Sequence, residues 1–265
     1  MKLKSQLMEL ILVGRRVVSS MVAVFIFIIG LLIGSFLNVV INRLPEGESI
    51  VFPPSHCPEC ESELSVWDLF PVLSFIFLRG QCRYCEAKIS LQYPLVELIT
   101  ASSALLLYFN FGLSLEFLIY AYLTALLIVV SLIDYKERII PNKITYPNII
   151  IALVLSIFSG HISLLASIAG LLLPGGFLLL LAILYKGGMG MGDVKLMAMV
   201  GSFIGANYAL IAIFLASFLG SAIGIGLIVV SDKDMKSAIP FGPFLALGSF
   251  ATIFWGEQII NFIFL

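Results

Sequence analysis

The chain has 265 residues, of which 60% are hydrophobic and only 12% are charged, whereas soluble domains carry about 25% charged residues. Its mean hydropathy is +1.11. The 16 acidic and 15 basic residues nearly cancel, so no basic surface indicates a nucleic-acid-binding protein. The composition therefore predicts an integral membrane protein.

The chain begins with a segment of mixed charge and apolarity, residues 1–20. We expect a disordered or surface-lying N-terminal extension there, followed by a first transmembrane helix at 21–42. A cleaved signal peptide is not expected, because the apolar run 17–42 is too long for the core of a signal sequence and no small-residue cleavage site follows it.

Further charge-free apolar runs follow at 98–115, 117–133, 144–185, 196–231 and 237–256. About 20 apolar residues cross a bilayer as a helix, so the run 144–185 must contain two helices, with a break at Gly160 and His161. The run 196–231 is also interpreted as two helices, the first of them short, broken between Gly205 and Asn207. The pattern predicts an all-α polytopic membrane protein with about eight transmembrane helices, its membrane core spanning 94–265.

The basic residues predict the orientation of these helices. Eleven lysines and arginines lie in the loops on one side, and the opposing loops 110–116, 160–163 and 205–208 contain none. Positively charged loops remain in the cytoplasm. The basic residues of the leading segment fall on the opposite side, but the loops outweigh them, so we expect the basic face to be cytoplasmic.

A polar insert at 43–93 separates the first two predicted helices and contains all four cysteines of the chain. The cysteines form two C-x-x-C pairs separated by 21 residues, Cys57 with Cys60 and Cys82 with Cys85. This spacing is typical of a tetrahedral zinc site, and a cytoplasmic loop keeps thiols reduced. Four thiolates leave no open position for water, so the predicted zinc is structural.

His56 is expected to be an exposed loop residue and not a ligand. The acidic surface of the insert is interpreted either as ordinary solvated surface or as a patch that attracts a basic peptide.

Four acidic residues lie within or at the edge of the predicted helices, where charge is costly and therefore indicates function. We interpret Glu97 and Glu116 as helix-end charges favoured by the helix dipole. Asp134 ends the third predicted helix and Asp193 begins the sixth, both at the basic face. Two carboxylates at one depth can share a proton, so that one activates water and the other donates to a carbonyl. This is the arrangement of an aspartyl protease.

Three glycines at alternate positions, Gly188, Gly190 and Gly192, precede Asp193. Glycine permits close backbone approach, so we expect this loop to lie against a substrate backbone while it holds Asp193. The alternative, a plain glycine-rich turn with Asp193 as helix N-cap, explains only one of the two aspartates. Lys195 is expected either to hold Asp193 ionised or to extend towards the membrane surface.

These motifs resemble the type IV prepilin peptidases, membrane aspartyl proteases of the G-x-G-D class. The resemblance rests on "GSFLNVVINRLP", the cysteine-bearing segment up to "YPLVELIT", "IDYKERIIPN", "GMGMGDVKL" and "IPFGPFLALG". It implies that Asp134 and Asp193 are catalytic and that the chain lies in the bacterial inner membrane. It further implies cleavage of the basic leader from prepilins or pseudopilins of type IV pili or secretion systems. We expect the apolar N-terminal helix of such a substrate to lodge between the membrane helices.

The cysteine-bearing insert resembles the bifunctional members of that family. This likeness implies that the new N-terminal residue is then N-methylated with S-adenosylmethionine, a role that rests on the resemblance alone. The alternatives are a cleavage-only peptidase with a structural zinc loop and a proton-coupled transporter, in which the aspartates would relay protons.

Overall fold

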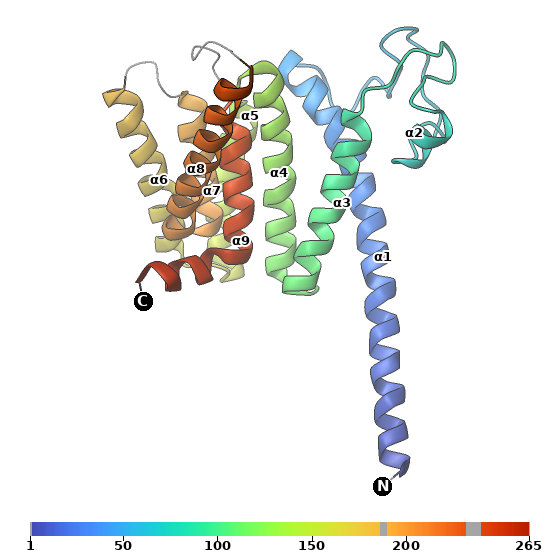
Figure 1. The fold of residues 1–265 in the computed structure, drawn as a ribbon, viewed down its shortest axis with the longest axis horizontal. Coiled ribbons are helices and arrows are strands. Elements are labelled where there is room, and N and C mark those ends of the chain that lie inside the picture. Colours follow the sequence, from blue (N-terminus) through green and yellow to red (C-terminus); the bar gives the residue numbers. More distant parts are fainter. Residues whose placement is uncertain (1, 186–189, 232–239, 265) are drawn as a thin grey trace. The chain divides into compact units, whose positions relative to one another are not determined.

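The computed structural model describes residues 2–185, 190–231 and 240–264 (Figure 1). Within these ranges the chain is helical and has no strand, only the isolated bridges His56–Glu63 and Gln81–Lys88. The helices are α1 (Lys2–Glu46), α2 (Leu73–Phe77), α3 (Gln92–Phe111), α4 (Leu115–Glu137), α5 (Asn142–Ser159), α6 (Leu164–Leu184), α7 (Met191–Ile204), α8 (Ala206–Ser231) and α9 (Gly242–Phe264). The predicted all-α class is confirmed.

Six helices in the described part of the chain are long and apolar enough to cross a membrane: the part of α1 from Ser20 onward, α3, α4, α5, α6 and the part of α8 up to Gly226. The chain is therefore a multi-pass membrane protein. Helix α7 has 14 residues, fewer than the roughly 20 that a bilayer core requires. The predicted breaks are confirmed: Gly160 ends α5 in the left-handed conformation, and Gly205 separates α7 from α8 with φ +83°.

Helix α1 differs from the prediction at both ends. It begins at Lys2, so the leading segment is helical and not a disordered tail, and it ends at Glu46 instead of residue 42. The leading segment consists mostly of lysine, leucine, methionine, glutamate and arginine, which have high intrinsic helix propensity. The high helix propensity of these residues explains why α1 begins well before its membrane-spanning part, which starts at Ser20.

The chain divides into two compact units. The first contains Met1–Val39 and Val51–Leu113, and so holds most of α1, the insert with α2, and α3. The second contains Val40–Ile50 and Ser114–Leu265, and so holds the end of α1 and helices α4 to α9. The cysteines lie in the first unit and both predicted catalytic aspartates in the second.

Helix α7 is central to the second unit and packs against α5 and α6. Most of it is buried, from Asp193 to Ile204. Helices α6 and α7 cross where Gly170 faces Gly201, and a Cβ on either residue would collide with the carbonyl of the other. Such small-residue crossings let membrane helices approach closely, since lipid provides no hydrophobic drive between them. Helix α9 packs against both α8 and α4. One end of this bundle therefore brings together the end of α4 and the starts of α7 and α9.

Candidate active site and metal centre

Asp134 lies in the last turn of α4, with 7% of the residue exposed. Helix α4 ends just beyond it, because Arg138 adopts the left-handed conformation and donates its backbone N–H to the Asp134 carbonyl. The side chain of Asp134 turns towards α9, and its Oδ2 accepts a hydrogen bond of 2.8 Å from the backbone nitrogen of Gly242. One of the two predicted carboxylates is therefore held by the start of another helix.

Gly242 is a site residue that sequence reasoning missed. It is the first residue of α9, so its N–H has no partner inside the helix and can donate to an anion. A Cβ at this position would lie 2.6 Å from Oδ2 of Asp134, so only glycine fits without displacement of the carboxylate. The signal was present in "FGP", a glycine directly before Pro243 at a helix start.

Asp193 lies in the first turn of α7 and is 9% exposed. The N-cap of α7 is Gly190, so the alternative in which Asp193 is the N-cap is wrong. The Asp193 carboxylate accepts a hydrogen bond from the Gly190 backbone. Gly190 has φ −77°, which any residue adopts, whereas a Cβ on Gly192 would lie 3.0 Å from Cβ of Ile140. The close approach at Gly192 is therefore to Ile140 of this chain. Gly188 lies outside the described residues.

The structure brings the two aspartates together. Their side chains are close enough for the charge on Asp134 to act on Asp193, although 59 positions separate them in sequence. Each carboxylate also lies at the N-terminal end of a helix, Asp134 at α9 and Asp193 in α7. Two buried carboxylates whose charges interact resist double ionisation, and hydrogen bonds at helix N-termini favour a single negative charge on such a pair.

Two lysines at this end of the bundle contact neutral groups. The Lys195 ammonium donates to Asn142 Oδ1 at 3.0 Å and lies over the Tyr146 ring, 5.4 Å from its centroid. The Lys136 ammonium donates to Asn42 Oδ1 at 3.0 Å. Of the two interpretations of Lys195, this geometry favours a lysine that extends along the surface over one that holds Asp193 ionised.

The four cysteines of the insert form one cluster, whose sulfur atoms all lie within 4.8 Å of one another. All four are free thiols, and the sulfurs of Cys57 and Cys85 are 3.8 Å apart. Four sulfurs bound to zinc at about 2.3 Å lie roughly 3.8 Å from one another, whereas a disulfide requires about 2.05 Å. The donor set and its spacing fit a tetrahedral metal ion. His56 is exposed and faces the Pro54 carbonyl, as expected for a loop residue.

The surroundings of the thiols are consistent with a bound cation. Hydrogen bonds from the Ser62 hydroxyl and backbone lower the pKa of Cys60 to about 6, because they stabilise its thiolate. At Cys85 the backbone of Ala87 also favours the thiolate, but the neighbouring cysteines outweigh it and raise the pKa to about 12. Ionisation of all four cysteines would therefore bring like charges together, and a divalent cation would relieve that repulsion.

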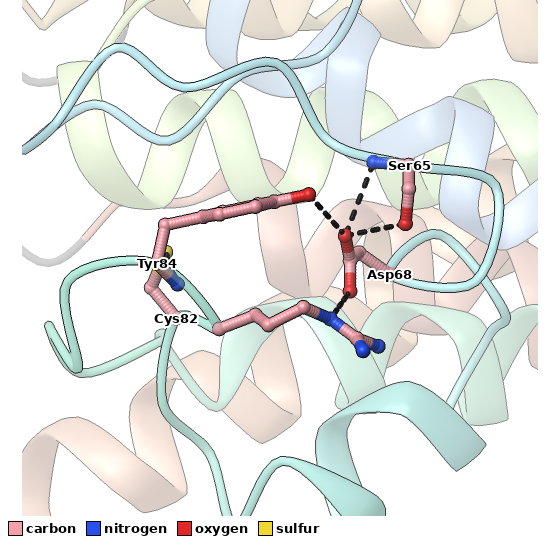
Figure 2. A network of polar contacts seen from close by, with 5 residues as sticks. Ser65, Asp68, Cys82 and Tyr84 are labelled. Atoms are coloured by element: carbon pink, nitrogen blue, oxygen red, sulfur yellow. Dashed lines mark hydrogen bonds and ion pairs between the residues drawn. The ribbon is translucent and has the colours of Figure 1, made fainter.

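Each C-x-x-C pair forms a turn, here called a knuckle: Cys57 and Cys60 in the first, Cys82 and Cys85 in the second. Asp68 joins the loop between the two knuckles to the second one (Figure 2). Its carboxylate accepts hydrogen bonds from the backbone and hydroxyl of Ser65 and from the Tyr84 hydroxyl, and pairs with the Arg83 guanidinium at 2.6 Å. Desolvation opposes its ionisation, yet the Ser65 hydrogen bonds and the Arg83 pair prevail and hold the pKa of Asp68 below its ordinary value. The network fixes the loop against the cysteine cluster.

The two other acidic residues have different surroundings. Glu116 lies in the first turn of α4, as predicted, with an Oε1 atom 3.9 Å from the His161 ring. The interpretation of Glu97 as a helix-end charge is wrong, because it lies beyond the first turn of α3 and is buried. Its Oε2 accepts a hydrogen bond of 2.7 Å from the backbone nitrogen of Val72. Glu97 therefore ties the insert to a membrane helix.

Comparison with known proteins identifies the chain. Residues 28–111 match the bacterial peptidase A24 N-terminal domain, and residues 121–225 match the type IV leader peptidase family. A protein of Bacillus subtilis (strain 168) is 35% identical over 89% of this chain and 96% of its own length. The chain belongs to the type IV leader peptidase family.

Two further relatives support the assignment. The Pseudomonas putida protein is 33% identical over 88% of this chain and 90% of its own length, and the Aeromonas hydrophila protein is 33% identical over 88% and 91%. All three relatives carry the name prepilin leader peptidase/N-methyltransferase. No solved structure matches the chain. The segment that matches the leader peptidase family contains both aspartates, and the N-terminal domain contains all four cysteines.

Proposed function

We propose that this chain cleaves the leader from prepilins or pseudopilins with Asp134 and Asp193, and then N-methylates the new N-terminal residue. The observation that carries the cleavage step is the placement of two buried carboxylates at the junction of α4, α7 and α9, near enough for their charges to interact. Methylation is carried over from relatives whose name includes N-methyltransferase. Leader peptides are basic, so the acidic insert and the shared negative charge both suit such a substrate.

In the cleavage step the two carboxylates share one proton. The ionised member removes a proton from water as the water oxygen attacks the scissile carbonyl carbon, and the protonated member donates to the carbonyl oxygen. When the C–N bond breaks, the departing amine takes a proton from the pair. The Gly242 N–H, at 2.8 Å from Asp134, holds that carboxylate in position through the reaction.

A cavity of about 320 Å³ lies between α8 and α9, and it suits an apolar substrate segment. Its lining combines small residues of α8 with aromatic side chains around the start of α9: Ser217, Gly220, Ser221, Phe241 and Phe244. Phe241 directly precedes Gly242. An apolar side chain in this cavity would therefore lie next to the residue that holds Asp134.

We also propose how the chain lies in the membrane. Eight of the helices cross the inner membrane, including α7, whose short length is compensated by its burial among its neighbours. The active site faces the cytoplasm, because the basic loops lie on that side. Zinc bound by Cys57, Cys60, Cys82 and Cys85 holds the insert folded. S-adenosylmethionine supplies the methyl group that the new terminal amine accepts.

The dyad is tested with Asp134→Asn and Asp193→Asn in membranes incubated with a prepilin. Each asparagine keeps the size of the side chain but cannot exchange the catalytic proton, so both variants should lose leader removal while their abundance is unchanged. Glu116→Gln, an acid at the other end of α4, is the matched control and should cleave normally. Normal cleavage by either aspartate variant would refute the dyad.

The methylation step is tested separately with a prepilin that has already been cut and with labelled S-adenosylmethionine. The two aspartate variants should still transfer label to this substrate, because the proposed peptide chemistry is no longer required. Cleavage by the wild-type protein without any transfer of label would instead indicate a peptidase whose insert is purely structural.

A further inference from the structure

The insert exposes a concentrated apolar surface between its two cysteine knuckles. Large aliphatic and aromatic side chains predominate there. Two of them are mostly exposed, Trp67 at 74% and Phe77 at 81%. The exposed members are Val66, Trp67, Leu69, Phe70, Leu73, Ile76 and Phe77. In a water-soluble loop, a patch of this composition indicates an interaction surface. We call residues 66–77 the apolar segment.

The apolar segment is held in place by defined contacts. Asp68, its only charged residue, pairs with Arg83 of the second knuckle (Figure 2). The rings of Trp67 and Phe70 stack with centroids 6.3 Å apart. The backbone nitrogens of Ser74 and Leu78 donate to carbonyls of the same region. The charge and several backbone N–H groups of the segment thus have partners within the insert or on α3, which lowers the cost of entering an apolar medium.

The depth of the apolar segment follows from its bond to α3. The Val72 backbone donates to Glu97, so the start of α2 lies beside α3 (Figure 1). Helix α3 has 20 residues, or about 30 Å, the thickness of a bilayer core. Glu97 comes five positions after Gln92, the first residue of α3, which places it about 7.5 Å along the helix from its end. Interfacial helices lie about 5–10 Å deep, at the boundary of headgroups and acyl chains.

We propose that the apolar segment lies in the lipid bilayer, at the headgroup–acyl boundary of the leaflet next to the insert. The partner is lipid because α3 is itself a membrane helix and Glu97 fixes α2 at membrane depth. Tryptophan and other aromatic residues are enriched at this boundary. Arg79 comes two positions after Phe77, the last residue of the segment, where a basic side chain can extend to the headgroups. The cysteine cluster is thereby held at the membrane surface. This inference does not depend on the proposed catalysis.

The chain has two tryptophans, Trp67 and Trp255, so Trp255→Phe leaves Trp67 as the only tryptophan reporter. The full-length variant is placed in nanodiscs of phosphatidylcholine and phosphatidylglycerol, with and without lipids brominated on the acyl chains. We expect blue-shifted emission from Trp67, several-fold quenching by brominated lipid and little quenching by iodide in the water. Emission typical of water, together with strong quenching by iodide, would overturn the proposal.

A second reporter addresses the C-terminal end of the apolar segment. In a background with Trp67→Phe and Trp255→Phe, Phe77→Trp should be quenched by brominated lipid, whereas Glu59→Trp on the first knuckle should be quenched by iodide. Protection of the Phe77→Trp reporter from both quenchers would show that the segment packs against protein, and would also overturn the proposal. Bound zinc and the thermal midpoint of each variant verify that the insert remains folded.

Discussion

Gly242→Ala tests whether the start of α9 positions Asp134 for catalysis. The added Cβ would lie 2.6 Å from Oδ2 of Asp134 and 3.0 Å from its Cγ, whereas ordinary contacts begin at 3.4 Å. The carboxylate or the helix must therefore move by about 0.8 Å. A displacement near 1 Å in a catalytic arrangement can reduce the rate by about 10²-fold, which corresponds to about 2.7 kcal/mol in the barrier.

The assay is the initial rate of leader removal from a prepilin in detergent or nanodiscs. We expect kcat to fall by about 10²-fold, with a smaller change in KM because substrate contacts elsewhere are retained. Overpacking costs about 1–3 kcal/mol of stability, so the thermal midpoint must be measured in parallel. Gly176→Ala is the matched control, because a Cβ there meets nothing within 4 Å. A folded Gly242→Ala protein with wild-type kcat would refute the reasoning.

Three further predictions follow from the insert and from the opposite end of the bundle. Cys60→Ser should reduce bound zinc, measured by elemental analysis of the purified protein; full retention would refute the four-thiolate site. Glu97→Ala removes the acceptor for the Val72 N–H and should speed limited proteolysis of the insert, whereas Glu97→Gln, which keeps an acceptor oxygen, should not. Burial lowers the pKa of His161 below 6.5, although the charge of Glu116 partly opposes this. The stability that neutral His161 contributes is therefore complete above pH 6.5 and declines as the pH falls below it. His161→Phe should accordingly flatten the drop in thermal midpoint between pH 8 and pH 5.5, and an unchanged drop would contradict this account.

Several features of this protein could be predicted from local sequence because physical chemistry leaves few alternatives. Apolar runs of about 20 residues must form helices in lipid, since every backbone group has to be paired internally. The breaks at Gly160 and Gly205 were predictable because glycine tolerates the positive φ that a turn requires. The spacing of the cysteines predicted a cluster, because two C-x-x-C turns each direct a pair of sulfurs to one point.

The partners of the acidic residues could not be predicted in this way. The contact between Asp134 and Gly242 joins positions 108 apart in the chain, and Glu97 binds Val72 of an insert without sequence periodicity. Such contacts depend on which helices pack together and at what height, and many pairings of apolar helices satisfy the same hydropathy pattern. By itself, then, the sequence determined the membrane helices, the cysteine cluster and the two aspartates. Only the tertiary structure decided that α9 begins against Asp134 and that α2 lies beside α3, because both depend on packing between distant segments.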